Sequence, residues 1–127
     1  MTWEFIEGQK RYLVGLSLSI ASSTPAAALS IAKSAASAIA GMGELTNGTP
    51  NQAQTYESSV VPSRPGFHSA DLDFYLWAVG DAAAAAAANS VAQAVSEKFG
   101  PCALAGIEEK DFGQLIGRTV YGGGKFH

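Results

Sequence analysis

The sequence predicts an α+β fold in which a four-stranded antiparallel sheet carries two alanine-rich helices on one face. The chain contains two alanine-rich stretches, SSTPAAALSIAKSAASAIAG at 22–41 and VGDAAAAAAANSVAQAVSEKFG at 79–100, and each directly follows an apolar run with strand character. The order strand, helix, strand therefore occurs twice, which gives the βαββαβ plan of the ferredoxin-like sandwich. Right-handed crossovers place both helices on the same side of such a sheet.

The first strand is predicted at residues 12–20, where large apolar side chains alternate with smaller ones. A period of two over nine residues indicates a strand with one buried face. The buried set is Tyr12, Val14, Leu16, Leu18 and Ile20, and the opposite set is Leu13, Gly15, Ser17 and Ser19.

The first helix is predicted to begin at Thr24-Pro25, because a hydroxyl side chain caps free N–H groups and proline suits a first helical turn. Its apolar positions recur at helical spacing, and Gly41 ends it. These positions are Leu29, Ala32, Ala36 and Ile39.

The second half repeats this plan with a strand at 72–79, a helix that begins at Asp81 as N-cap and ends at Gly100-Pro101, and a strand at 102–109. In the strand at 72–79, one side carries Phe74, Leu76 and Ala78, and the other carries Tyr75, Trp77 and Val79. The apolar positions of the helix are Ala84, Ala88, Val91, Val95 and Phe99. Alanine favours helix and lets a helix lie close to the sheet, so the bulk of the core must come from the strands.

The remaining strand is predicted near residues 54–61, inside a long loop at 43–70 that is rich in turn-forming residues. We expect a single domain over 1–127, with an N-terminal arm at 1–11, the core at 12–110 and a C-terminal strand or arm at 111–127. A further strand is expected within the C-terminal arm, at 114–121.

The charge is weak: eight Lys and Arg and eleven Asp and Glu give a formal net charge of −3. The basic residues are scattered and form no stripe for a phosphate backbone, which argues against nucleic-acid binding. No run of about 18 apolar residues is present, so we expect no membrane-spanning helix. Glu4 and Glu7 argue against a signal peptide at the N-terminus. We expect the protein in the cytoplasm or within an assembled particle.

Few residues could carry chemistry. His68 is the one candidate proton carrier near neutral pH, and the nearby Ser69 and Asp71 lack the setting of a catalytic triad. Cys102 is expected to be a small buried side chain. The sequence offers no catalytic set, no metal site and no cofactor-binding motif.

One surface remains as a candidate site: the sheet face away from the helices, with Gly15, Ser17 and Ser19 from the first strand and Tyr75 and Trp77 from the third. Aromatic side chains over small floor residues favour a protein interface. The alternatives are a small-molecule pocket, or cover by the terminal arms. The arms contribute Trp3, Phe5, Leu115, Ile116 and Val120 to such cover.

Three functions follow from this face. The first is a non-enzymatic structural or assembly subunit whose partners are copies of itself or other protein subunits. The second is a small-molecule-binding protein or enzyme of the dimeric α+β barrel type, with Tyr75, Trp77 and His68 lining the cavity. The third, ranked last, is a single-stranded RNA reader that stacks bases on the central aromatics.

Overall fold

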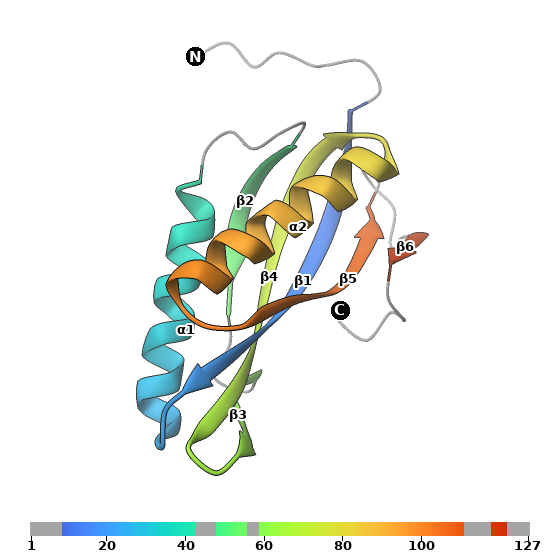
Figure 1. The fold of residues 1–127 in the computed structure, drawn as a ribbon. Helices are drawn as coiled ribbons and strands as arrows, with labels where there is room; N and C mark the ends of the chain where they lie inside the picture. Colours follow the sequence, from blue (N-terminus) through green and yellow to red (C-terminus); the bar gives the residue numbers. More distant parts are fainter. Residues whose placement is uncertain (1–8, 43–47, 56–58, 111–117, 122–127) are drawn as a thin grey trace.

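The computed structural model describes residues 9–42, 48–55, 59–110 and 118–121, and it shows an antiparallel sheet with two helices (Figure 1). The elements in chain order are β1 (Gln9–Ala21), α1 (Pro25–Ala40), β2 (Gly48–Gln54), β3 (Val61–Arg64), β4 (Phe67–Val79), α2 (Asp81–Lys98), β5 (Cys102–Glu109) and β6 (Arg118–Tyr121). The strand order is β2-β4-β1-β5-β6, and β3 pairs with β4. The α+β class is confirmed, but within the described residues the sheet has six strands, where the sequence predicted four and a further one at 114–121.

The centre of the sheet is the antiparallel pair of β1 and β4. They pair along their whole length, from Gln9 opposite Val79 to Ala21 opposite Phe67. The even-numbered residues of both strands from Tyr12 to Ile20 and from His68 to Ala78 are buried, and they pack under α1 and α2. The alternation predicted for both strands is therefore confirmed, although each strand is longer than predicted.

The core combines small helix residues with large sheet residues. The buried residues of α1 are four alanines and Ile39, and those of α2 are four alanines and two valines. The largest fully buried side chains are mostly on the strands, led by Tyr12, Phe74 and Leu16. The predicted division of bulk is confirmed, because alanine brings each helix close enough for the sheet side chains to fill the layer between them.

The two helices begin differently. Thr24 caps α1 as predicted, and its Oγ1 accepts a hydrogen bond from the Ala27 N–H at 3.3 Å. Asp81 was predicted to cap α2, but the N-cap residue is Gly80, whose φ of +96° suits glycine. The Asp81 carboxylate instead accepts a hydrogen bond from the Tyr12 hydroxyl at 3.0 Å. The Asp81 carboxylate, predicted to accept from the N–H groups at the start of the helix, thus accepts from the buried Tyr12 on the central strand.

The predicted second strand at 54–61 is wrong, as is the loop at 43–70. That region holds β2, β3 and the first residues of β4. The turn-forming residues Gly48 and Pro50 lie in β2, which is an edge strand, and a strand that pairs on one side tolerates proline.

The last two strands complete the sheet beyond β1. β5 matches its predicted range, and the pairing shifts by one residue between Gly15 and Leu16, so that Gly15 faces Gly106 and Leu16 faces Leu104. β6 pairs with β5 and lies within the range predicted for a further strand, at its C-terminal end.

Candidate functional site

The open face of the sheet, defined here as the side of β1 and β4 away from α1 and α2, is the main candidate site. The register of β1 and β4 places Gly15, Ser17, Ser19, Tyr75 and Trp77 on this face together, as the alternation predicts. No helix of the described residues packs against it. Its role as an interface or ligand surface remains a prediction.

Side-chain size divides the open face into two ends. At one end Leu13 lies opposite Tyr75 and Arg11 lies opposite Trp77, so four large side chains adjoin. Next to them Gly15 lies opposite Asp73 and Ser17 opposite Asp71, followed by Ser19 opposite Ser69. The Oγ atoms of Ser17 and Ser69 are 3.4 Å apart. Between Arg11 and Ser19 the face therefore has a raised end of large side chains and a low end of small and acidic ones, and beyond the low end Phe67 lies opposite Ala21.

Charged side chains that the sequence analysis did not select also belong to the open face. The Arg11 guanidinium lies over the Tyr75 ring at 4.8 Å from its centroid. Asp71 and Asp73 follow the same alternation on β4, two residues apart on one side. Arg11 was missed because the strand was predicted to begin at Tyr12. Following the alternation two residues further from Leu13 on β1 gives Arg11. Following it from Tyr75 towards the start of β4 gives Asp73 and then Asp71.

Two polar atoms of this face are buried without a hydrogen-bond partner among the described residues: Nε of Arg11 and Oδ1 of Asp73. Burial raises the pKa of the Asp73 carboxyl, and the negative charge of Asp71 raises it further. Burial also raises the pKa of Asp71. By contrast, the charges of β5 and its neighbours are paired: Lys10 lies 3.7 Å from Glu109, and Lys110 lies 2.8 Å from Glu108. The open face thus concentrates polar groups that need a partner.

The alternative that the terminal arms cover this face concerns residues that lie largely outside the described ones. Trp3, Phe5, Leu115 and Ile116 are not among them. Val120 is described, and it lies on β6, half-buried against the edge of the core.

His68 is not a solvated loop residue, and it does not line a cavity with Tyr75 and Trp77. It lies on β4 at an even-numbered position, so its side chain points to the helix side, where it is 5% exposed. Its Nδ1 lies 2.9 Å from the Ser22 carbonyl oxygen. Because a carbonyl can only accept, Nδ1 donates and the neutral ring carries its proton there. The proposed proton carrier is therefore separated from the open face by the sheet.

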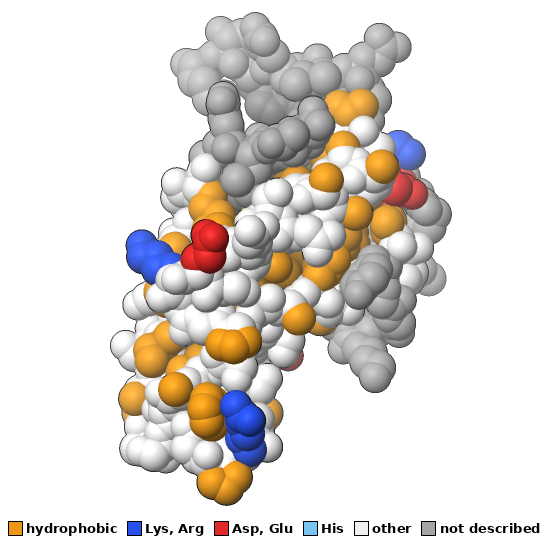
Figure 2. Space-filling model, in the orientation of Figure 1, with side chains coloured by type: hydrophobic (Ala, Val, Ile, Leu, Met, Phe, Trp, Pro, Cys, Tyr) orange, Lys and Arg blue, Asp and Glu red, His pale blue; other side chains and the backbone are white. Residues whose placement is uncertain are grey.

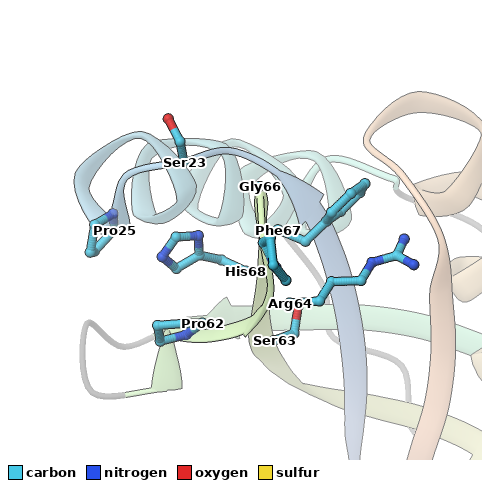
Figure 3. Close-up of a pocket in the computed structure, with 9 residues that line it drawn as sticks. Ser23, Pro25, Pro62, Ser63, Arg64, Gly66, Phe67 and His68 are labelled. Carbon is cyan, nitrogen blue, oxygen red and sulfur yellow. The ribbon is translucent and has the colours of Figure 1, made fainter.

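A groove of about 460 Å³ surrounds His68, between the β3–β4 hairpin and the start of α1. Figure 3 shows the imidazole between Pro25 and Pro62, while Arg64 and Phe67 extend the other way. The Arg64 guanidinium stacks on the Phe67 ring at 4.0 Å from its centroid, away from the imidazole. The groove therefore offers one largely buried imidazole between proline rings, and Arg64, which also lines it, extends away from that ring.

Cys102 opens β5, half-buried on the helix side, and burial raises the pKa of its thiol to about 11. Its backbone N–H donates to Ser96 Oγ at 2.9 Å, and its carbonyl accepts from the same hydroxyl at 3.1 Å. Cys102 thus ties β5 to the end of α2. Within the described ranges, no three His, Cys, Asp or Glu side chains gather in a group that could hold a metal ion.

The helix side of the molecule has a different surface. Figure 2 shows this side, where charged side chains are few. Three exposed polar side chains of the helices bond to their own backbone: Ser34 donates to the Ser30 carbonyl, Asn89 to that of Ala85 and Ser90 to that of Ala86. These groups are already satisfied, unlike those of the open face. None of the described helices is long and apolar enough to cross a membrane.

No protein-family model matches this chain, and no curated protein matches it. Among solved structures, the chain is similar to a putative aminohydrolase from methicillin-resistant Staphylococcus aureus, with 13% sequence identity and a TM-score of 0.38. The match covers 81% of this chain and 29% of the staphylococcal chain. A similarity of this degree assigns no activity to the protein.

Proposed function

We propose that this chain is a non-enzymatic assembly subunit that self-associates through the open face of its sheet. The observation that carries the proposal is the group of large side chains at the raised end of that face. Leu13, Tyr75 and Trp77 are half-buried there, and Val79 beside them is 50% exposed. Aromatic and aliphatic side chains gathered on one face of a small protein are typical of protein–protein interfaces.

The proposal includes a ferredoxin-like core. The order β2-β4-β1-β5, with α1 after β1 and α2 after β4, supports this topology, and β3 and β6 would be additions to it. Such a core has helices on one side of its sheet. A second protein layer on the other side would remove the large side chains of the open face from water.

A second candidate, a small-molecule-binding protein or enzyme of the dimeric α+β barrel type, uses the same face. One observation favours it: the buried Asp73 Oδ1, on the same face, has no hydrogen-bond partner within the described ranges. A ligand that donates a hydrogen bond would satisfy this oxygen.

Sedimentation equilibrium at micromolar concentration tests the proposal. We expect the mass of the wild-type protein to exceed that of one chain and to fall on dilution. Trp77→Lys on the open face should shift the equilibrium towards single chains. Gln93→Lys, an exposed position on α2, adds the same charge on the helix side and should leave the equilibrium unchanged. Circular dichroism checks that both variants are folded.

Two results would overturn the proposal: a wild-type mass of one chain throughout the concentration range, or dissociation by Gln93→Lys and not by Trp77→Lys. A wild-type chain that is single in solution and whose Tyr75 and Trp77 fluorescence responds to a small molecule would favour the second candidate instead.

A further inference from the structure

The open face is complementary to itself. Along the β1–β4 pair, the cross-strand pairs Arg11–Trp77 and Leu13–Tyr75 form the raised end, and Gly15–Asp73 and Ser17–Asp71 form the low end. The Val14–Phe74 pair, whose side chains point to the helices, lies midway between the two ends. A second copy turned by 180° about this midpoint therefore places its low end over the raised end of the first copy.

The charges follow the same division. Arg11 is the cation of the raised end, and Asp71 and Asp73 are the acids of the low end. Within the described residues none of the three forms an ion pair, whereas Lys10, Lys110, Glu108 and Glu109 of the neighbouring positions do. Arg11 and Asp71 are separated along the strands by six residues, roughly 20 Å at the usual rise of a strand, so they are too far apart to pair within one chain.

From these two observations, we propose that the second copy docks face to face about a two-fold axis. The axis runs parallel to the plane of the sheet, perpendicular to the strands, and passes above the Val14–Phe74 pair. It places Arg11 of each copy against Asp71 and Asp73 of the other. This inference rests on the proposed function and adds the geometry and the partner. It is the isologous arrangement in which one patch contacts itself, and the strands of the two sheets run nearly in line, as in aligned sheet packing.

In this arrangement each large side chain meets a small one. Leu13 lies over Gly15 of the second copy, Tyr75 over its Asp73, and Trp77 over its Asp71. The guanidinium, which leans over Tyr75, is thereby directed at the two carboxylates of the second copy. The Arg11 Nε and the Asp73 Oδ1 are enclosed within the single chain, whereas both side chains as a whole are only half-buried. The outer N–H groups of the guanidinium and the outer carboxylate oxygen would therefore make the contact. A charge-assisted hydrogen bond between the two groups would offset the cost of burying them.

A charge swap tests the pairing. Arg11→Glu alone and Asp71→Arg alone should each raise the dissociation constant about 100-fold or more, because each places two like-charge contacts in the symmetric pair. Mixing the two variants in equal amounts should restore association as a heterodimer, because both contacts between unlike copies are then attractive. Lys98→Glu on α2 makes the same charge change as Arg11→Glu outside the face and should have no effect.

The outcomes separate this inference from the proposed function. Dissociation by both single variants without recovery on mixing would overturn the pairing and leave self-association standing. Unchanged dissociation constants for both single variants would also overturn the pairing. A single-chain wild type, for instance because a segment of the chain itself covers the face, would overturn both.

A cross-link gives a second measurement if a charge variant fails to fold. In the Cys102→Ser background, Asp71→Cys with Trp77→Cys places two thiols on one strand that are too far apart to join within a chain. The proposed axis brings each beside the other on the second copy, so mild oxidation should give a covalent dimer. The arrangement would be overturned if this double variant gave no covalent dimer while a Ser30→Cys control on α1 did.

Discussion

Gly100 approaches the backbone of Ser19 so closely that a Cβ atom at Gly100 would lie 2.6 Å from the Ser19 carbonyl oxygen. The contact occurs where the chain leaves α2 and enters β5, and the Ser19 N–H donates to the Pro101 carbonyl at 2.8 Å. Gly100 also has a φ of +137°, which other residues rarely adopt. Gly100, two residues beyond the end of α2, is thus also the point at which the second half of the chain meets the end of β1.

Gly100→Ala should therefore destabilise the protein strongly. We expect the free energy of unfolding to fall by about 2–4 kcal/mol, since backbone strain and a clash with backbone act together. Gly66→Ala is the matched control, because Gly66 has a φ of +80° with open space around its Cβ position. It should cost about 1 kcal/mol from the backbone alone. Urea denaturation compares the two, and equal losses would show that the Ser19 contact has no role.

Removal of the Tyr12 hydroxyl should also lower stability. Tyr12 is fully buried, and its hydroxyl donates to the Asp81 carboxylate at 3.0 Å. Tyr12→Phe keeps the ring and should reduce the free energy of unfolding by about 1–2 kcal/mol, as expected for a hydrogen bond to a charged acceptor. Asp81→Asn retains an acceptor and should cost less than Asp81→Ala. An unchanged unfolding midpoint for Tyr12→Phe would contradict this account.

The fold could be predicted where local patterns and tertiary packing agree. Two local patterns were sufficient to predict β1 and the start of α1: the alternation from Tyr12 to Ile20 and the Thr24-Pro25 pair. Each pattern depends only on residues that are adjacent in the chain. The second strand failed because Pro50 is acceptable only at the edge of a sheet, and a sequence does not show which strand is at the edge. Asp81 failed for a similar reason, because its partner Tyr12 lies 69 residues away.

The candidate site shows the same limit. The face shared by Gly15, Ser17, Ser19, Tyr75 and Trp77 could be predicted, because side-chain direction along a strand follows from parity alone. The same alternation places His68 on the other side of the sheet from Tyr75. This could be used only once His68 was known to lie in β4, because the strand was predicted to begin at residue 72. The pairing of Arg11 with the Tyr75 ring depends on the β1–β4 register, which no local pattern contains.

Cys102 should react slowly with alkylating reagents in the folded protein. Burial raises its pKa to about 11, and the thiolate is the reactive form. At pH 8 we expect iodoacetamide to modify the folded protein about 100-fold more slowly than the urea-unfolded protein, whose thiol has an ordinary pKa. The rate in the folded protein should rise about tenfold per pH unit between pH 7 and 9. Mass spectrometry follows the modification, and similar rates in the folded and unfolded protein would refute the prediction.

Asp73 should contribute more to the free energy of unfolding in mild acid than at neutral pH, where its carboxyl is ionised. Its pKa is raised above 3.8 by burial and by Asp71, so between 3.8 and the raised value the folded state binds more protons than the unfolded state. The contribution of Asp73 to the free energy of unfolding therefore falls as pH rises through this interval. At neutral pH its ionised form is a net cost to folding.

Asp73→Asn removes that cost and should raise the free energy of unfolding at pH 7, by no more than about 1 kcal/mol because solvent partly screens the carboxyl. The gain should shrink as the pH falls and vanish below the ordinary pKa of 3.8, where both states of the wild-type carboxyl are protonated. Urea denaturation at pH 7, 5 and 3 measures it, at a protein concentration low enough for single chains, because association would add the contact proposed for Asp73. Asp71→Asn is the companion variant, since it removes the neighbouring charge and should give a gain of the same sign. A gain from Asp73→Asn that is as large at pH 3 as at pH 7 would mean that packing, and not charge, is responsible.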